Sequence, residues 1–119
     1  MRREEYILLI INIEEDYKKL GHTNCPPFGD EKIWFNNYGL DHLFYKGRIP
    51  RTIEEVIKRS ILLLQVPALL KNVRSIHSEE KRTKGKSIAY FWTIKEDGIR
   101  IILRRVNDGK LHFFSIMKE

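Results

Sequence analysis

Cysteine is nearly absent from this sequence. Cys25 is the only one, which excludes an internal disulfide and is typical of a chain in a reducing compartment. His22 lies three residues before it, but no second pair has the spacing of zinc ligands, so no metal is expected. Glycine loops that cradle phosphates and dinucleotide fingerprints are also missing, and we expect no cofactor.

Long hydrophobic runs are lacking as well. The most apolar stretch, residues 6–13 (YILLIINI), is far too short to span a bilayer. Glu4 and Glu5 precede it, acidic residues follow it, and no small-residue cleavage site comes after it, so the pattern is not that of a signal peptide. We therefore expect no membrane partner and a cytoplasmic protein.

Internal repeats, low-complexity segments and interdomain linkers are missing too, so residues 1–119 are expected to form a single domain. The 42% hydrophobic and 32% charged residues are typical of a globular chain with one core. The net charge of +6 favours acidic partners such as nucleic acid, an anionic membrane surface or an acidic inhibitor protein. Because many proteins without such partners have a similar excess, charge alone does not identify the partner.

Helical periodicity is the first positive signal. Residues 3–20 have apolar side chains at spacings of three and four and end at Gly21, which predicts a helix. Thr52 and Glu55 form a capping box that starts a second helix. Arg59 falls outside its predicted buried stripe. That stripe comprises Ile53, Val56, Ile57, Ser60, Ile61 and Leu64.

The segments around the second helix are irregular. Residues 22–30 predict a loop, and residues 33–45 predict an extended piece followed by a helical turn. Pro67 is expected to break or kink the second helix. The polar and charged residues 73–87 predict a mobile loop.

The last third of the chain predicts three antiparallel strands. Residues 88–94, 99–106 and 110–117 are rich in β-branched and aromatic residues, and glycine turns at 96–98 and 107–109 join them. Strands that follow helices along the chain indicate an α+β fold. We expect N-terminal helices packed on one face of a C-terminal antiparallel β-meander.

Strand register decides which side chains share a face. Three-residue loops at both turns would pair Ile94 with Arg100, and would place Arg104 between Tyr90 and His112. The predicted core face then comprises Ala89, Phe91, Thr93, Ile99, Ile101, Leu103, Leu111 and Phe113. The opposite face comprises Tyr90, Trp92, Arg100, Ile102, Arg104, His112 and Phe114. A two-residue turn at 108–109 would instead put Arg104 beside Phe113, on a face shared with Ser115.

The second of these faces is unusual for a small sheet. Two arginines four residues apart, a histidine beside one of them and flanking aromatic rings suit a phosphate and a base. We interpret this face as the floor of a ribonuclease site. The alternative is an ordinary solvated face of an antiparallel sheet.

Several segments resemble the barnase/EndoU/colicin/RelE-like superfamily of small metal-independent ribonucleases, in particular its phage and mobile-element branch. They are residues 39–43 (GLDHL), 50–51 (PR), 58–64 (KRSILLL), 99–106 (IRIILRRV) and 110–117 (KLHFFSIM). The similarity covers residue 38 to the end, and residues 1–37 have no counterpart. In this superfamily N-terminal helices lie against a C-terminal antiparallel sheet.

The resemblance implies a toxin-like endoribonuclease held in check by a cognate antitoxin or immunity protein. It implies attack of the ribose 2′-hydroxyl on the adjacent phosphate, which leaves a 2′,3′-cyclic phosphate. The catalytic residues that it implies are His42 before the long helix, Arg100 and Arg104 of the central strand, and His112 and Ser115 of the last strand. Some members have a glutamate base on the sheet, whereas Glu96 lies in a turn here.

This reaction needs a base, an acid and cations around the phosphorane. We assign His42 as the base and His112 as the acid, although these two roles can be exchanged. Arg104 is the main phosphate ligand, and Arg100 supports it. As alternatives, His42 is a packed, half-buried histidine and Ser115 is a hydrogen-bonded interior serine.

RNA contacts are expected at two further places. Tyr90 and Trp92 are candidates for stacking a base, and the basic loop with Lys46, Arg48 and Arg51 suits the flanking phosphates. As alternatives, the two aromatics cover a minor second core, and the loop is merely solvated. A non-catalytic RNA- or DNA-binding module and an antitoxin or immunity-type interaction protein stay open as functions. The sequence does not indicate the oligomeric state.

Overall fold

The computed structural model describes residues 2–119. Its α-helices are α1 (Arg3–Lys18), α2 (Asn37–Phe44), α3 (Ile53–Leu63) and α4 (Val66–Asn72). Its strands are β1 (His22–Asn24), β2 (Lys32–Trp34), β3 (Tyr45–Lys46), β4 (Ile49–Pro50), β5 (Ser78–Lys84), β6 (Ser87–Glu96), β7 (Ile99–Val106) and β8 (His112–Lys118), and a short 3₁₀ helix, η1, covers Pro26–Phe28. Within these residues, no helix combines the length and the apolar character needed to cross a membrane.

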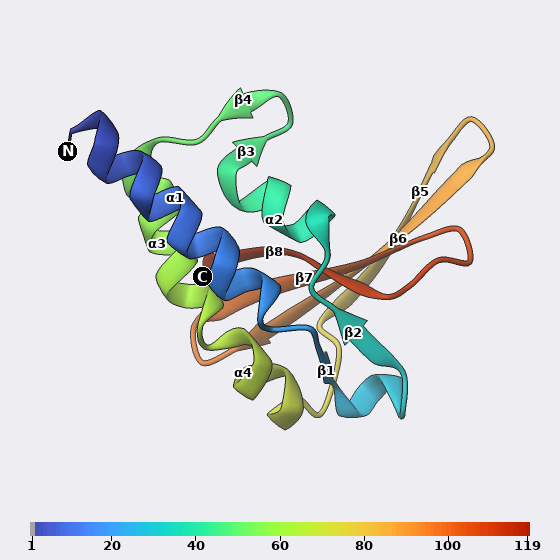
Figure 1. The fold of residues 1–119 in the computed structure, drawn as a ribbon. Helices are drawn as coiled ribbons and strands as arrows, with labels where there is room; N and C mark the ends of the chain where they lie inside the picture. Colours follow the sequence, from blue (N-terminus) through green and yellow to red (C-terminus); the bar gives the residue numbers. More distant parts are fainter. Residues whose placement is uncertain (1) are drawn as a thin grey trace.

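Six strands form one sheet in the order β1-β2-β8-β7-β6-β5. All neighbours are antiparallel except β2 and β8, which are parallel and pair at Trp34 and His112. Figure 1 shows α1, α3 and α4 gathered on one side of the sheet, while the β5–β6 and β7–β8 hairpins reach away from them. The predicted α+β fold is therefore confirmed, and β1, β2 and β5 extend the predicted three-stranded meander.

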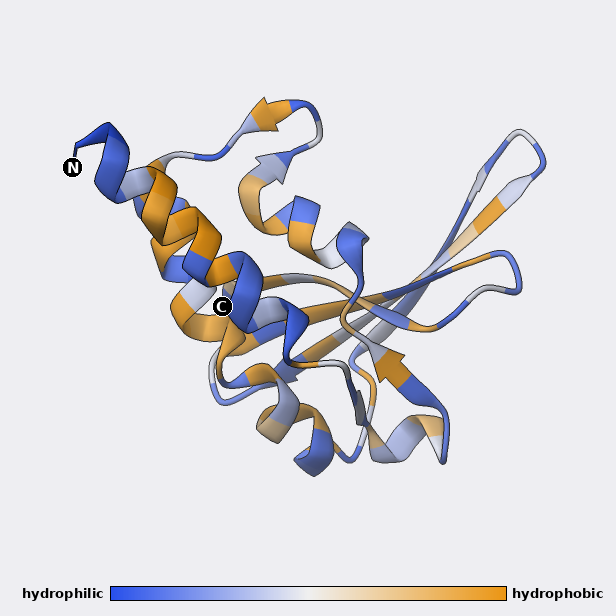
Figure 2. Cartoon of the chain, in the orientation of Figure 1, coloured by the Kyte–Doolittle hydropathy of each residue, from blue (hydrophilic) through white to orange (hydrophobic). Residues whose placement is uncertain are grey.

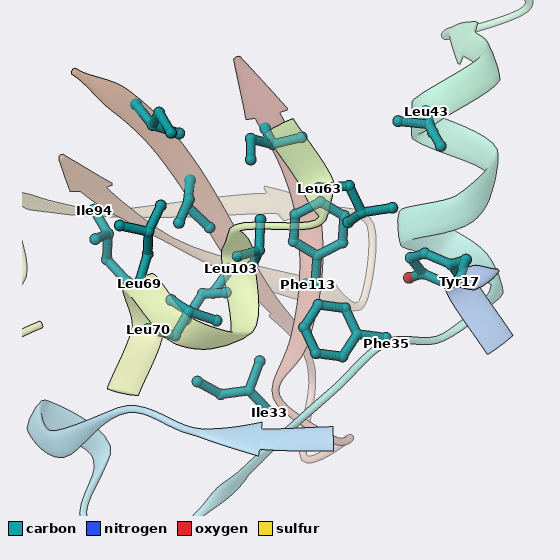
Figure 3. Packing of buried hydrophobic residues seen from close by; sticks show 14 of the residues in the cluster. Tyr17, Ile33, Phe35, Leu43, Leu63, Leu69, Leu70, Ile94, Leu103 and Phe113 are labelled. Atoms are coloured by element: carbon teal, nitrogen blue, oxygen red, sulfur yellow. The ribbon is translucent and has the colours of Figure 1, made fainter. Parts of the chain in front are cut away.

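The core fills the space between these helices and the sheet (Figure 3). Apolar residues run along the middle of α1 and along α3 (Figure 2). The fully buried side chains include Tyr17, Ile33, Val56, Val66, Leu70, Ile94, Ile101, Leu103 and Phe113. The Tyr17 hydroxyl donates to the Asn36 carbonyl at 2.7 Å, which ties α1 to the residue that caps α2. The core thus fixes the position of α2, which lies against β8.

Helix α3 begins as predicted and buries Val56 as predicted, but the rest of its buried stripe differs. The Thr52 hydroxyl accepts a hydrogen bond from the Glu55 amide at 3.2 Å. Ile61 and Leu64, predicted to be buried, are 59% and 68% exposed, whereas Arg59 is buried. The predicted stripe is therefore wrong at these three positions.

Arg59 is buried because it satisfies the outer edge of β8. Beyond the single pairing with β2, no strand of residues 2–119 lies beside this edge. The Arg59 Nη1 atom donates to the Ile116 carbonyl at 2.8 Å and to the Ser115 hydroxyl at 3.3 Å, and its Nε pairs with Glu55 at 2.8 Å. One long side chain therefore compensates for missing strand hydrogen bonds and keeps its charge paired.

Residues 73–87, predicted as a mobile loop, contain strand β5. Its seven residues (SEEKRTK) are all exposed and pair with β6 along their whole length. Both faces of β5 contact water, so its sequence lacks the alternation by which half-buried strands are recognised. The predicted loop at 22–30 likewise contains β1 and η1.

The β6–β7 register differs from the predicted one. The connecting turn has two residues, Asp97 and Gly98, with positive φ angles of 51° and 74°. Ile94 consequently pairs with Ile101 and not with Arg100. Two-residue turns of this kind match the twist of the strands, whereas the prediction assumed three residues.

This shift exchanges the two faces of β6. Phe91 lies opposite Arg104, whereas Trp92 lies opposite the buried Leu103. Tyr90 and Trp92 are therefore on the face that bears the core, and the prediction that they share a face with Arg104 is wrong. Phe91, predicted in the core, takes their place.

The β7–β8 pairing follows the prediction at the two candidate site residues, Arg104 and His112. Arg104 pairs with His112, as three-residue turn geometry predicts. Further along, the register shifts between Ile102 and Leu103, so that Phe114 has no partner of its own on β7. Such a bulge re-aims side chains. Phe114 consequently lies with its ring 4.4 Å from the Arg104 guanidinium.

Candidate nucleic-acid site

The face of the sheet opposite the core helices carries the candidate site, and we refer to it as the open face. Arg104 and His112 lie side by side on it. Helix α2 adds Tyr38, whose ring centroid is 4.8 Å from the Arg104 guanidinium and 5.6 Å from the His112 ring. The Arg104 cluster comprises Tyr38, His42, Arg51, Arg104, His112 and Phe114.

Arg104 is held between two aromatic rings. Its guanidinium carbon is 4.8 Å from the Tyr38 ring and 4.4 Å from the Phe114 ring. Its Nε donates to His112 Nε2 at 3.0 Å, whereas Nη1 and Nη2 have no acceptor among residues 2–119. No carboxylate pairs with it in this part of the chain, and burial lowers its pKa. Two donor groups of a fixed cation are thus available to an anion.

His112 is neutral and orients Arg104. Only 4% of this residue is exposed, and burial lowers its pKa, although the hydrogen bond to the Lys110 carbonyl opposes the shift. Its Nδ1 donates to that carbonyl at 3.0 Å, which leaves Nε2 to accept from Arg104. A proton on Nε2 would face the Arg104 N–H. The arrangement favours a positioning role, and the predicted role of general acid stays untested.

His42 is the second neutral imidazole. Its ring stacks on Phe114 with centroids 4.4 Å apart. Arg51 donates from Nη2 to His42 Nε2 at 3.2 Å and from Nε to the His42 carbonyl at 3.0 Å. Burial, followed by the charges of Arg51, Arg59 and Arg104, lowers the pKa of His42 to about 4. The imidazole is therefore unprotonated near neutral pH, as a general base must be, but an arginine occupies its lone pair.

Two hollows flank Tyr38, which is 61% exposed and lines both. The smaller has a volume of about 330 Å³ and is lined by Tyr38, Asp41, His42, Tyr45, Gly47 and Phe114. The larger has a volume of about 580 Å³ and is lined by Asn36, Tyr38, Arg104, Val106, Gly109, Lys110 and His112. Because the larger hollow contains two cationic side chains, it is the better site for a phosphate. A separate apolar hollow of about 180 Å³ lies between α1 and α3, on other elements.

Two predicted catalytic residues lie apart from Arg104. Arg100 is four residues along β7, roughly 13 Å away at the rise of an extended strand, and its Nε pairs with Glu119 at 3.0 Å. Ser115 is 2% exposed and accepts its hydrogen bond from Arg59, as the interior alternative expects. Neither side chain reaches the hollows with a free polar group.

The predicted RNA contacts are divided between the two faces. Tyr90 and Trp92 stack on each other on the core-bearing face, and Trp92 packs edge-on against Phe28. Lys46 and Arg48 are exposed on the β3–β4 hairpin, whose residues also line the smaller hollow. Arg51 is bound to α2 by its two contacts with His42. Of the predicted set, only the hairpin cations are free in the described chain to meet a flanking phosphate.

Three aromatic residues of the open face were missed by the sequence reasoning. Trp34 reaches this face through the parallel pairing of β2 with β8, and Tyr38 reaches it through the docking of α2. Phe91 reaches it through the short turn between β6 and β7. The first two depend on contacts between segments distant in sequence, so local patterns carried no signal for them.

In residues 2–119 no three His, Cys, Asp or Glu side chains come together in a group that could hold a metal ion. Comparisons with protein-family models, with curated proteins and with solved structures found no match to this chain. The superfamily named above therefore stays a resemblance based on the sequence segments.

Proposed function

We propose that this protein is a metal-independent, toxin-like endoribonuclease. The observation that carries the proposal is the Arg104 guanidinium, oriented at Nε by a neutral imidazole, clamped between two rings and unpaired by any carboxylate in residues 2–119. Its free donors border a hollow that also contains Lys110. A planar cation fixed in advance suits the charge that develops on a phosphorane.

In the proposed reaction, the scissile phosphate occupies the larger hollow against Arg104 and Lys110. A base removes the proton of the ribose 2′-hydroxyl, the O2′–P bond forms, and the P–O5′ bond breaks. The O5′ atom takes up a proton, and a 2′,3′-cyclic phosphate remains. His42 lines the smaller hollow, so it is the proposed base for a ribose that lies over Tyr38, which borders both hollows. This role requires that substrate displace the Arg51 contact, consistent with catalytic hydrogen bonds that rearrange on binding.

The proposed acid is a proton-bearing side chain of the larger hollow, Tyr38 or Lys110, rather than the buried His112. His112 acts through Arg104 as a positioning residue. The cytoplasm is the proposed site of the activity, and a cognate antitoxin or immunity protein is the proposed partner.

The first prediction concerns Arg104 and uses total cellular RNA in the presence of EDTA. We expect the wild-type protein to cut it and leave 2′,3′-cyclic phosphate ends. Arg104→Ala should lose about 100- to 1,000-fold in rate, as removal of a donor to a transition-state oxyanion does in other enzymes. Arg104→Lys should restore part of the activity, because it returns the charge without the fork.

Arg100→Ala is the matched control, since it removes an arginine of the same strand that is bound to Glu119. It should cut at close to the wild-type rate. Circular dichroism of each variant verifies the fold. Intact RNA at high protein concentration, inhibition by EDTA, or full activity of Arg104→Ala would contradict the proposal.

A second candidate is a non-catalytic module that binds single-stranded RNA on the same face. The observation in its favour is that both imidazoles are neutral and accept hydrogen bonds from arginines, so neither has a free lone pair. Protein that retains RNA at low salt without cutting it, and whose retention weakens in Arg104→Ala, selects this function.

A further inference from the structure

Trp34 is the centre of a second basic and aromatic group on the open face. It lies beside His112 in the neighbouring strand, at the spacing of paired strands, roughly 4.8 Å. The Lys110 ammonium is 4.2 Å from the Trp34 ring centroid, and the Lys32 ammonium is 5.7 Å away. His22, opposite on β1, meets the ring edge-on with centroids 4.9 Å apart.

This group shares Lys110 with the candidate site. Lys110 lines the larger hollow and also covers the Trp34 ring, so it links Arg104 to the edge of the sheet. Lys32 and Lys110 are exposed, and neither forms an ion pair within the described residues. Unpaired cations beside an aromatic ring are the elements with which proteins hold single-stranded nucleic acid.

We infer that Trp34, Lys32 and Lys110 form a flanking nucleotide subsite that extends the RNA site from the Arg104 hollow towards β2. The inference rests on the proposed function, since it concerns the same RNA. A base stacks on the Trp34 ring, and the adjoining phosphate draws the Lys110 ammonium away from that ring. Stacking on a π-face does not depend on which base is present. The subsite therefore raises the affinity for longer RNA whatever its base sequence.

The test uses fluorescein-labelled 2′-O-methyl oligouridines of about two to eight nucleotides, a range that begins below and ends within the site sizes of about 4–16 nucleotides known for single-strand binders. The methyl group removes the attacking hydroxyl, so binding is measured by fluorescence polarisation without cleavage. Wild-type affinity should rise with length. Trp34→Leu should bind the longest oligonucleotide about 5- to 150-fold more weakly, the range that stacking of one base supplies. It should bind the shortest one normally.

Tyr90→Leu is the matched control. Tyr90 is also an aromatic residue of the sheet with a lysine ammonium above it, Lys81 at 6.0 Å, but it lies on the opposite face. The affinity of the Tyr90→Leu variant should still rise with oligonucleotide length. Because Trp34 is partly buried, Lys32→Gln provides a second variant that leaves the packing intact. It should weaken the binding of the longest oligonucleotide only.

The outcomes separate this inference from the proposed function. A length effect that survives in Trp34→Leu and Lys32→Gln, or that disappears in Tyr90→Leu instead, overturns the subsite even if unmodified RNA is cut. A length effect lost in Trp34→Leu supports the subsite even if unmodified RNA is never cut, and the endoribonuclease proposal then fails alone.

Discussion

At the scale of single residues, the open face contains two arginine–histidine pairs. Arg104 donates to His112, and Arg51 donates to His42, in both cases at Nε2. An arginine has no lone pair, so each contact requires a neutral imidazole. Burial lowers the pKa of both histidines. In the free protein these imidazoles set the direction of guanidinium groups and do not carry charge themselves.

This pairing predicts a loss of stability in acid. The pKa of folded His42 is about 4, below its ordinary 6.5. Between these values the unfolded chain binds a proton that the folded chain does not, so stability falls as the pH decreases. We expect the free energy of unfolding from urea denaturation to drop by about 2 kcal/mol from His42 between about pH 7 and pH 5.

His42→Gln should lose less stability over the same interval, whereas His77→Gln, which changes an exposed histidine, should behave as the wild type does. Equal losses in the wild type and His42→Gln would show that His42 titrates normally.

At the scale of elements, hydrophobic pattern predicted the strands and turn geometry determined their partners. Residues 88–94, 99–106 and 110–117 all fall largely within strands. The register of β6 could not be read, because a turn at 96–98 admits two or three loop residues and the difference of one residue exchanges the faces. Strand β5 could not be recognised at all, since a strand exposed on both sides has no apolar period.

The position of helix α2 on β8 is fixed by a close contact at Gly39. A Cβ atom on Gly39 would lie 2.5 Å from the Phe113 carbonyl oxygen and 2.5 Å from the Tyr17 hydroxyl. Gly39→Ala would gain about 1 kcal/mol of helix propensity, but the contact with β8 backbone forces the helix outwards. We expect a net loss of about 2 kcal/mol in the free energy of unfolding, measured with urea, since overpacking costs about 1–3 kcal/mol or more.

Asn37→Ala, on the exposed side of the same helix, should change stability by less than about 0.5 kcal/mol. Because Tyr38 and His42 move with α2, Gly39→Ala should also weaken RNA binding. Wild-type stability in Gly39→Ala would mean that α2 is free to shift on β8.

At the scale of the whole molecule, the predictable part of the site was the local part. Arg104 and His112 belong to one hairpin, so strand periodicity and turn length were enough to predict that they pair. Trp34 and Tyr38 reach the open face only because β2 and α2 pack against β8 from distant parts of the chain. Arg59 illustrates the same limit, since its burial depends on a strand edge that the local sequence does not reveal.

The distribution of cations predicts how RNA binding depends on salt. For single strands, log affinity falls with log salt by about 0.7 for each phosphate contact. Replacing Lys46 and Arg48 together by alanine should reduce this slope by about 1.4, measured with uncleavable oligouridine between about 50 and 200 mM KCl. Lys71→Ala, on helix α4 at the other side of the sheet, should leave the slope unchanged. An unchanged slope in the double variant would place the hairpin outside the RNA path.

Strand β5 is an edge strand of the sheet, and its outer row of backbone donors and acceptors has no partner strand within the described residues. Such a row is a template on which the same row of another molecule can assemble. Here five of the seven side chains along it are charged, and every one is in water. A second molecule could pair with β5 only by removing water from these charges, which is unfavourable. The charged edge therefore discourages fibril growth even though the β5–β6 hairpin is long.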